Sequence, residues 1–432
     1  MREEAAVRSV YLCIDLKSFF ASVECVERGL DPMTARLVVA DPARSSGTIC
    51  LAVSPEMKRL GVRNRCRVYE IPKEVEYIMA EPRMQKYLDY SAAINRIYER
   101  YIAPEDLHVY SIDEVFIDAT PYLARYKTDA HGLAVFLMER VAAETGIRAT
   151  CGIGENLFLA KVALDITAKH ARDFIGELDE ERYRATLWDH EPLTDFWYIG
   201  PATARRLARV GIRTMRGIAQ MDERWLYREF GVAAKVLIEH ARGHEPTTLA
   251  EIKSYRPRTR SLSSGQVLLR DYSFAEARII VREMTDRLCL DMVEQEVVTP
   301  SVTLTVGYSG IGSALSAHGT AALPFPANAD CVLLPAVTEV YDRIVSRSLP
   351  IRRITLACNN LSPDNGDLPE QLSLFAQNPL SAAVARNRRL QHTVLQIHAR
   401  FGRNALLKGM DFDPAATTRE RNHQIGGHKS GT

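Results

Sequence analysis

The pattern of apolar and polar positions in the first 178 residues switches between strand and helix periods. Residues 10–14, VYLCI, form a short apolar run typical of a buried strand, and a segment with helical spacing follows at once. The stretch 107–120, LHVYSIDEVFIDAT, alternates strongly and predicts two strands around a tight turn. This succession favours an α/β or α+β layer. The pattern predicts further strands at 37–41, 48–53, 75–82 and 148–154 and helices at 54–62, 83–101, 130–146 and 156–170.

After residue 178 the pattern changes to short helices punctuated by glycine. The stretch 198–212, YIGPATARRLARVGI, has the form of a helix-hairpin-helix, and the polar, arginine-containing stretch 253–261 predicts an extended linker. A second, smaller α+β domain follows, and the segment 359–370 has the Pro, Gly, Asn and Asp content of a loop. The elements expected in that second domain are strands at 302–309 and 351–358 and helices at 274–292 and 335–347.

Composition adds a few limits to this picture. A chain of 432 residues predicts several domains, and a net charge of +1 gives no global argument for binding nucleic acid or membrane. Eight cysteines without a CxxC pair indicate neither a zinc site nor a disulfide framework, which fits a cytoplasmic protein. No signal peptide and no run of ~18 apolar residues is found, so we expect no membrane association. The one strong local charge is in the tail from Pro379, with nine basic and three acidic residues.

Three acids sit at strand ends where a carboxylate is expensive to bury. Asp15 ends the first strand, and Asp113 and Glu114 lie in the turn of the predicted hairpin. Carboxylates crowd together only when cations cancel their repulsion, and Mg²⁺ prefers such oxygen ligands. Two ions ~3.5–4 Å apart can activate an attacking hydroxyl and stabilise a leaving pyrophosphate. The alternative is that these acids cap turns or helices.

Two aromatic residues follow Asp15 closely enough to lie beside such a site. Phe19 and Phe20 belong either to a helix whose aromatic side chains enter the core or to a wall that packs against a nucleotide sugar. In the second case a bulky ring leaves no room for a 2′-hydroxyl. The sequence leaves both readings open.

Two motifs carry a family resemblance. VYLCIDLKSFFASVE (10–24) and YSIDEVFID (110–118) resemble the paired catalytic signatures of the Y-family DNA polymerases, the low-fidelity translesion enzymes. Three further segments resemble other parts of that family: 152–169 its third palm motif, 196–212 its thumb helix-hairpin-helix, and 260–272 the start of its little finger domain. The matches lie in family order and span nearly the whole chain.

The resemblance implies an α+β multidomain fold of the right-hand polymerase type. The implied parts are a ferredoxin-like palm (1–30 and 78–178), small fingers (31–77), a helical thumb with the helix-hairpin-helix (179–246), a linker (247–258), an α+β little finger (259–358), a second linker with a clamp-binding peptide (359–378) and a basic C-terminal tail (379–432).

The resemblance also implies site residues in the palm. Asp15, Asp113 and Glu114 would be catalytic and would bind two Mg²⁺ ions, with the backbone carbonyl of Leu16 as a further ligand. Phe20 would be the steric gate that selects deoxynucleotides. Phe19 would pack beside the incoming nucleotide.

The triphosphate contacts depart from the usual family pattern. Many members place a Tyr and an Arg on the fingers helix, whereas this chain has Pro55 and Lys58 there, which is similar to the UmuC branch. We therefore assign Lys58 to the triphosphate, with Arg59 as the alternative, and Lys169 matches a further lysine that reaches it. A lysine cannot reproduce a bidentate guanidinium, so weak nucleotide affinity is expected.

DNA contacts are expected from the glycines and arginines outside the palm. Gly200 and Gly211 of the helix-hairpin-helix would let a phosphate approach the backbone closely. Arg256, Arg258 and Arg260 either track the duplex backbone or form a solvated charge run.

A short apolar peptide follows the second linker. Gln371, Leu372, Leu374 and Phe375 of QLSLF are expected to be exposed and need a partner that buries them. They resemble the pentapeptide by which bacterial polymerases dock into the sliding clamp.

The sequence therefore predicts a template-directed, low-fidelity DNA polymerase that adds deoxynucleotides to a primer 3′-hydroxyl opposite damaged template. Its partners would be primer-template DNA, deoxynucleoside triphosphates and the sliding clamp. The need for an accessory subunit or a recombinase, as in the UmuC branch, stays open. A nucleotide cyclase would have no use for the helix-hairpin-helix, and a catalytically silent DNA-binding scaffold would have lost an acid.

Overall fold

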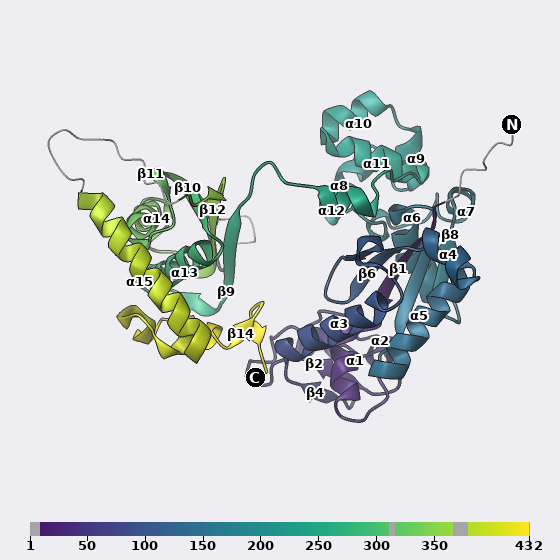
Figure 1. Ribbon diagram of the computed structural model, residues 1–432, viewed down its shortest axis with the longest axis horizontal. Helices are drawn as coiled ribbons and strands as arrows, with labels where there is room; N and C mark the ends of the chain where they lie inside the picture. The colour runs from purple at the N-terminus through teal and green to yellow at the C-terminus, as the bar shows by residue number, and fades with distance from the viewer. Residues whose placement is uncertain (1–8, 311–315, 366–378, 432) are drawn as a thin grey trace. The chain divides into compact units, whose positions relative to one another are not determined.

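The computed structural model describes residues 9–310, 316–365 and 379–431, and the chain divides into two compact units. The first unit comprises residues 1–255 together with 428–432, and the second comprises residues 256–427. Figure 1 shows the elements of each unit.

A five-stranded sheet forms the centre of the first unit, in the order β5-β6-β1-β7-β8. The central strand β1 pairs antiparallel with both β6 and β7, while β8 runs parallel to β7. Every residue of β7 is buried, as expected for a strand covered on both faces. The strands are β1 (Tyr11–Leu16), β5 (Leu107–Val109), β6 (Glu114–Asp118), β7 (Ala149–Gly154) and β8 (Ile175–Leu178).

Helices cover both faces of this sheet. Leu12 and Ile14 of β1 enter the larger core with the helices α1, α3 and α5, whereas Tyr11 and Cys13 face the other way and pack with α6. The helices of this region are α1 (Phe19–Val26), α3 (Met84–Glu99), α4 (Thr120–Tyr126), α5 (Ala130–Thr145) and α6 (Leu157–Val162), which continues as a π-helix over Ala163–Thr167 and a 3₁₀ turn over Ala168–His170.

Glycines explain how closely α6 lies on the sheet. A Cβ at Gly152 would sit 2.0 Å from the carbonyl oxygen of Ala160, and one at Gly154 would sit 2.2 Å from the Ala160 nitrogen. Only glycine permits this approach of helix backbone to strand. The Gly-Ile-Gly pattern therefore serves helix–strand packing.

A small three-stranded sheet and a cluster of short helices complete the first unit. Val38 and Met57 centre the small sheet's core, and Tyr183, Leu207 and Leu226 centre that of the helical cluster. The small sheet has the order β3-β2-β4, from β2 (Leu37–Val39), β3 (Ala52–Val53) and β4 (Ile78–Ala80), with α2 (Pro55–Arg59) beside it. The helical cluster contains α7 (Glu180–Thr186), α8 (Pro201–Ala208), α9 (Met215–Gln220), α10 (Glu223–Phe230) and α11 (Ala233–Arg242).

The second unit contains a five-stranded antiparallel sheet packed against helices: four strands follow the order β11-β10-β12-β9, and β13 pairs with β10. Val302, Leu304 and Leu356 point from the sheet into a core shared with Ile280 and Leu333 of the helices. Its elements are β9 (Leu262–Tyr272), α13 (Phe274–Glu294), β10 (Val297–Tyr308), β11 (Ser316–Ala327), α14 (Asp330–Ile344), β12 (Ile351–Asn359), β13 (Ser362–Pro363), α15 (Pro379–Phe401), α16 (Thr418–Arg421) and β14 (Gln424–Ile425).

Several elements differ from the pattern-based expectation. The strands β8 and β11 and the helix α4 were not predicted, and the strand expected at 48–53 is reduced to Ala52–Val53. The helix α12 (Leu249–Ser254) lies in the stretch 247–258 that we expected to be a linker, because Leu249 is buried against β1 and α6.

The basic tail begins with the helix α15 and contributes residues to the core of the second unit. Within the second unit, α15 contacts α13 and α14, and Val384 and Ala415 are buried in the core. No helix in the described part of the chain is long and apolar enough to cross a membrane.

Candidate active site

The three predicted acids meet at one end of the central strands. Asp15 is the direct cross-strand partner of Glu114 in the β1–β6 register. The Leu16 amide donates to the carbonyl oxygen of Asp113 at 2.9 Å, which places Asp113 beside the same end. Residues about a hundred positions apart in the chain are thus brought together by strand pairing. The Ser111 hydroxyl donates to Asp113 Oδ1 at 2.6 Å and orients that carboxylate.

The surroundings of Asp15 make its ionised form unfavourable. Burial raises the pKa of Asp15 to about 7, and the charges of Asp113 and Glu114 act in the same direction, while Lys161 opposes them. A positive charge beside this carboxylate would favour its ionised form.

Glu114 already has a positive partner. Lys161 Nζ on α6 lies 3.0 Å from a Glu114 carboxylate oxygen and 3.1 Å from Asp165 Oδ1. The Cys13 thiol donates to Glu114 Oε1 at 3.1 Å. The sequence reading missed Lys161, and the only signal for it was a single lysine in the otherwise apolar turn LFLAKV with an acid four residues later.

The donor chemistry of these acids fits a divalent cation. Asp15, Asp113 and Glu114 supply the hard oxygen ligands that Mg²⁺ prefers, and burial, together with the charges of Asp113 and Glu114, raises the pKa of Asp15. In the part of the chain that the structure describes, no three His, Cys, Asp or Glu side chains are drawn together closely enough to enclose an ion.

Lys17, Lys58 and Lys169 interact electrostatically with one another, and Lys17 and Lys58 also interact with Asp15; we call these three residues the lysine cluster. The pKa of Lys58 is lowered by burial and by Lys169, while Asp15 and Asp113 raise it. The pKa of Lys17 is likewise lowered by burial, by Lys58 and by Lys169, and its ammonium group lies 4.0 Å from the centre of the Phe174 ring.

The two predicted triphosphate ligands on α2, Lys58 and Arg59, have different surroundings. Lys58 shares the electrostatic surroundings of Asp15, whereas Arg59 forms a bidentate ion pair with Glu56, both contacts at 2.7 Å. The geometry therefore favours Lys58 over Arg59. Lys17 was not predicted, although its place two residues after Asp15 was a signal.

The two aromatic residues have different surroundings. Phe19 is only 3% exposed and packs in the core, so its ring offers little surface to a nucleotide. Phe20 is partly buried and stacks on Tyr87 of α3, with ring centres 4.5 Å apart and an angle of 17°. The core reading thus applies to Phe19, and Phe20 is the ring that can form a wall.

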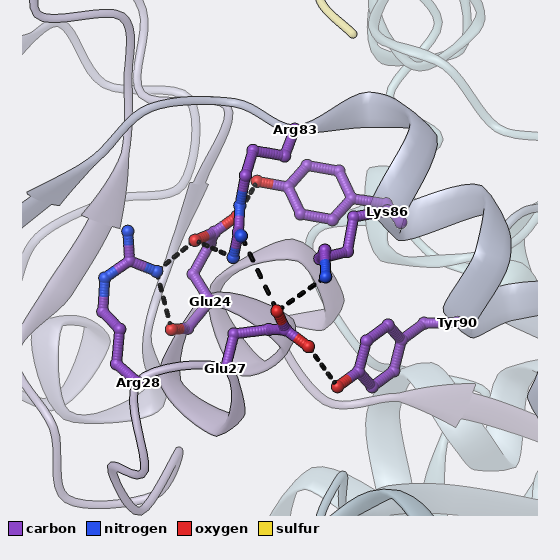
Figure 2. A network of polar contacts seen from close by, with 7 residues as sticks. Glu24, Glu27, Arg28, Arg83, Lys86 and Tyr90 are labelled. Atoms are coloured by element: carbon purple, nitrogen blue, oxygen red, sulfur yellow. Dashed lines mark hydrogen bonds and ion pairs between the residues drawn. The ribbon is translucent and has the colours of Figure 1, made fainter. Parts of the chain in front are cut away.

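A buried polar network lies behind that wall (Figure 2). The Tyr87 hydroxyl donates to Glu24 Oε1 at 2.8 Å, and Arg83 donates to both Glu24 oxygens at 2.9 Å. Burial alone would raise the pKa of Glu24, but hydrogen bonds from Arg83, Arg28 and Tyr87 lower it below its ordinary value. The network was not predicted from the sequence.

The predicted DNA-contacting residues have room around them. Gly200 is the N-cap of α8, Gly211 has a φ of +82°, and nothing lies within 4 Å of the position that a Cβ would take on either. Arg256, Arg258 and Arg260 are exposed at the start of the second unit. The proposed clamp peptide, Gln371, Leu372, Leu374 and Phe375, lies outside the described residues.

Known proteins match this architecture along most of the chain. Residues 14–165 match the impB/mucB/samB family, and residues 259–374 match the C-terminal domain of the same family. UvrX of Bacillus subtilis, a protein named for UV-damage repair, is 29% identical over 426 residues, which is 98% of each chain. DNA polymerase IV 2 of the same organism is 28% identical over 424 residues, 97% of this chain and 98% of that one.

A solved structure supports the fold. A Y-family DNA polymerase chimera superposes with a TM-score of 0.63 at 18% identity, covering 81% of this chain and 98% of that one. Together with the family match, this superposition accounts for the two units of the chain, and for the small sheet and the helical cluster within the first unit. The chain belongs to the Y-family DNA polymerases, and it is a DNA-directed DNA polymerase with the α+β right-hand fold of that family.

Proposed function

We propose that this polymerase adds deoxynucleotides to a primer 3′-hydroxyl opposite damaged template, with low fidelity and with two Mg²⁺ ions. The observation that carries the proposal is the meeting of Asp15, Asp113 and Glu114 at one end of the central sheet, beside the lysine cluster.

In this proposal each group has a separate task. Asp15, Asp113 and Glu114, with the carbonyl of Leu16, would hold the ions. When bound, Mg²⁺ lowers the pKa of an attacking hydroxyl and stabilises a leaving pyrophosphate. Lys161 holds Glu114 in place through its 3.0 Å contact with the carboxylate.

The substrate would be bound by charge and shape. Lys58 and Lys169 would bind the triphosphate, and Lys17 adds a third positive charge to the lysine cluster. The Phe20 ring, supported by Tyr87, would exclude a 2′-hydroxyl. Gly200, Gly211 and the arginines at 256–260 would contact the phosphates of primer-template DNA.

We also propose the division of the chain given by the sequence: palm, fingers (31–77), thumb (179–246) and little finger (259–358). The peptide at 371–375 would bind the sliding clamp. The proposal that damaged template is the substrate takes support from the relatives that are named for DNA repair and for DNA polymerase IV.

Primer extension on matched undamaged and abasic-site templates tests this proposal. Wild-type protein with Mg²⁺ should extend both primers, and Asp113→Ala should extend neither while still binding the duplex. Wild-type activity indistinguishable from that of Asp113→Ala would instead support the catalytically silent scaffold.

A further inference from the structure

The residues from His428 to Gly431 belong to the first unit, although the sequence between them and residue 256 belongs to the second. We call this segment the strap. The family match ends at residue 374, so the strap lies outside the part of the chain that the family model describes. Nothing in the proposed chemistry uses it.

Two ion pairs hold the strap against the region between the small sheet and α3. Lys429 Nζ lies 3.2 Å from Asp41 Oδ1 and forms a second ion pair with Glu81. Asp41 is only 8% exposed, so this lysine neutralises a carboxylate that the fold has largely removed from water.

A backbone contact then completes the first turn of α3. The N-cap residue of this helix, Arg83, makes no side-chain capping hydrogen bond. The Gln85 amide, one of the donors that an α-helix leaves without an internal partner, donates to the Ser430 carbonyl oxygen at 2.9 Å. The strap therefore performs the capping that the local sequence of α3 does not supply.

A glycine allows the closest approach. Gly431 has a φ of +77°, and a Cβ on it would lie 2.6 Å from Arg83 Cβ and 2.7 Å from Arg83 Cα. Any other residue would have to displace the strap or the start of α3. The backbone at Gly431 thus packs directly on the residue whose guanidinium holds Glu24.

These contacts form one path to the nucleotide wall. Gly431 touches Arg83, Arg83 binds both oxygens of Glu24, Glu24 accepts from the Tyr87 hydroxyl, and the Tyr87 ring stacks on Phe20. Arg83 is the N-cap residue of α3 and Tyr87 lies one turn further along the helix, so both adjoin the turn that the strap caps.

We propose that the strap is a positioning element of the nucleotide site: seated on Asp41, Glu81 and the start of α3, it fixes Arg83 and Tyr87 and thereby the depth of the Phe20 ring. The effect on sugar selection rests on the proposed role of Phe20 as the gate, whereas the capping of α3 does not.

Amide hydrogen exchange of the full chain tests the capping directly. Lys429→Glu and Gly431→Ala should each speed exchange at the Gln85 amide by about tenfold, because both changes unseat the Ser430 carbonyl. Lys429→Arg should keep the wild-type rate. Arg389→Glu, the same charge change at an exposed position of α15, is the matched control and should also leave the rate unchanged. An unchanged rate in both test variants would overturn the proposal.

Sugar selection tests the positioning. The two test variants should lower the preference for deoxynucleotides over ribonucleotides by about threefold or more, through KM for the ribonucleotide, since a small displacement of a wall is felt in binding geometry. Faster exchange with unchanged selection would overturn the positioning role. Failure of wild-type protein to extend any primer would refute the proposed function, and the exchange rates would still decide whether the strap caps α3.

Discussion

Glu24 has no exposed surface, yet the surrounding residues keep it ionised. Arg83, Arg28 and Tyr87 all donate to it, and their combined effect exceeds the cost of burial. At the scale of single residues, the Tyr87 ring on which Phe20 stacks is therefore held by a buried charged group.

The lowered pKa of Glu24 gives a prediction for stability and pH. Since its pKa in the folded protein lies below the ordinary value near 4.5, its contribution is present above that value and is lost as the pH falls through the folded pKa. Glu24→Gln should lower the free energy of unfolding of the first unit by about 2 kcal/mol at pH 7 and by progressively less toward pH 3.

Thermal unfolding of wild type, Glu24→Gln and Glu139→Gln between pH 3 and 7 measures this effect. Glu139 is exposed on α5, so its variant should follow wild type at every pH. A constant deficit of Glu24→Gln across the range would contradict a role for the charge.

Phe20 gives a second prediction at this scale. Replacing the ring by Ala should remove the proposed barrier to a 2′-hydroxyl, so that ribonucleotide incorporation rises by about tenfold or more, a change of about 1.4 kcal/mol in transition-state selection. Single-nucleotide incorporation assays with matched deoxy and ribo substrates measure it. Unchanged sugar discrimination would remove Phe20 from this role, and Phe412→Ala, an exposed phenylalanine of the second unit, controls for nonspecific effects.

Single residues were predictable where they stand at the ends of recognisable strands. Asp15, Asp113 and Glu114 belong to this class, because each follows or interrupts an apolar pattern. Lys161, Lys17 and the Glu24 network were not predicted, since their partners lie on other elements and only the packing of α1, α3 and α6 brings them together.

At the scale of elements, the position of α6 decides where Lys161 reaches Glu114. The helix backbone rests on Gly152 and Gly154 of β7, and its continuation as a π-helix over Ala163–Thr167 rests on Gly176 of β8, where a Cβ would lie 2.5 Å from the Ala163 carbonyl oxygen. The π-helix changes the winding just before Lys169, so the place of that lysine depends on it.

Gly152→Ala should therefore destabilise the first unit by about 2–3 kcal/mol, because the new methyl group meets backbone atoms that cannot move independently. Gly200→Ala is the matched control, since nothing lies within 4 Å of its Cβ and its φ of −81° suits alanine. Denaturant unfolding followed by tryptophan fluorescence compares the two. Equal stability of Gly152→Ala and Gly200→Ala would contradict the packing argument.

The elements with long, regular periods were predicted well, as α3 and α5 show. The short strand β8, the π-helix and α12 were not, because four to six residues carry too little periodicity to outweigh the tertiary contacts that define them. The packing role of the Gly-Ile-Gly in β7 became visible only in the structure.

At the scale of the molecule, most of the tail from residue 379 belongs to the second unit. Some of its basic residues pair within that unit. Arg388 lies 2.5 Å from Asp364 and Lys408 lies 2.5 Å from Asp286. The order of motifs along the chain predicted the right-hand fold, whereas the packing of this tail could not be read from composition.

The proposed clamp peptide at 371–375 leads to a prediction about binding to the sliding clamp. Replacing Leu374 and Phe375 by Ala should abolish binding to the sliding clamp and leave primer extension without the clamp unchanged, because the peptide lies outside the proposed catalytic residues. Surface plasmon resonance with immobilised clamp measures the first effect and primer extension the second. Clamp binding at wild-type strength would reject the peptide assignment.

The central claim is that Asp15, Asp113 and Glu114 together bind divalent cations. Titration of Mn²⁺ into the complex with primer-template and nucleotide, followed by electron paramagnetic resonance, tests it most directly. Asp15→Asn and Asp113→Asn should each weaken Mn²⁺ binding by about a hundredfold, since each removes a carboxylate ligand. Asp118→Asn, at the opposite end of β6 from Glu114, should bind as wild type does. Equal Mn²⁺ affinity in all four proteins would contradict the account.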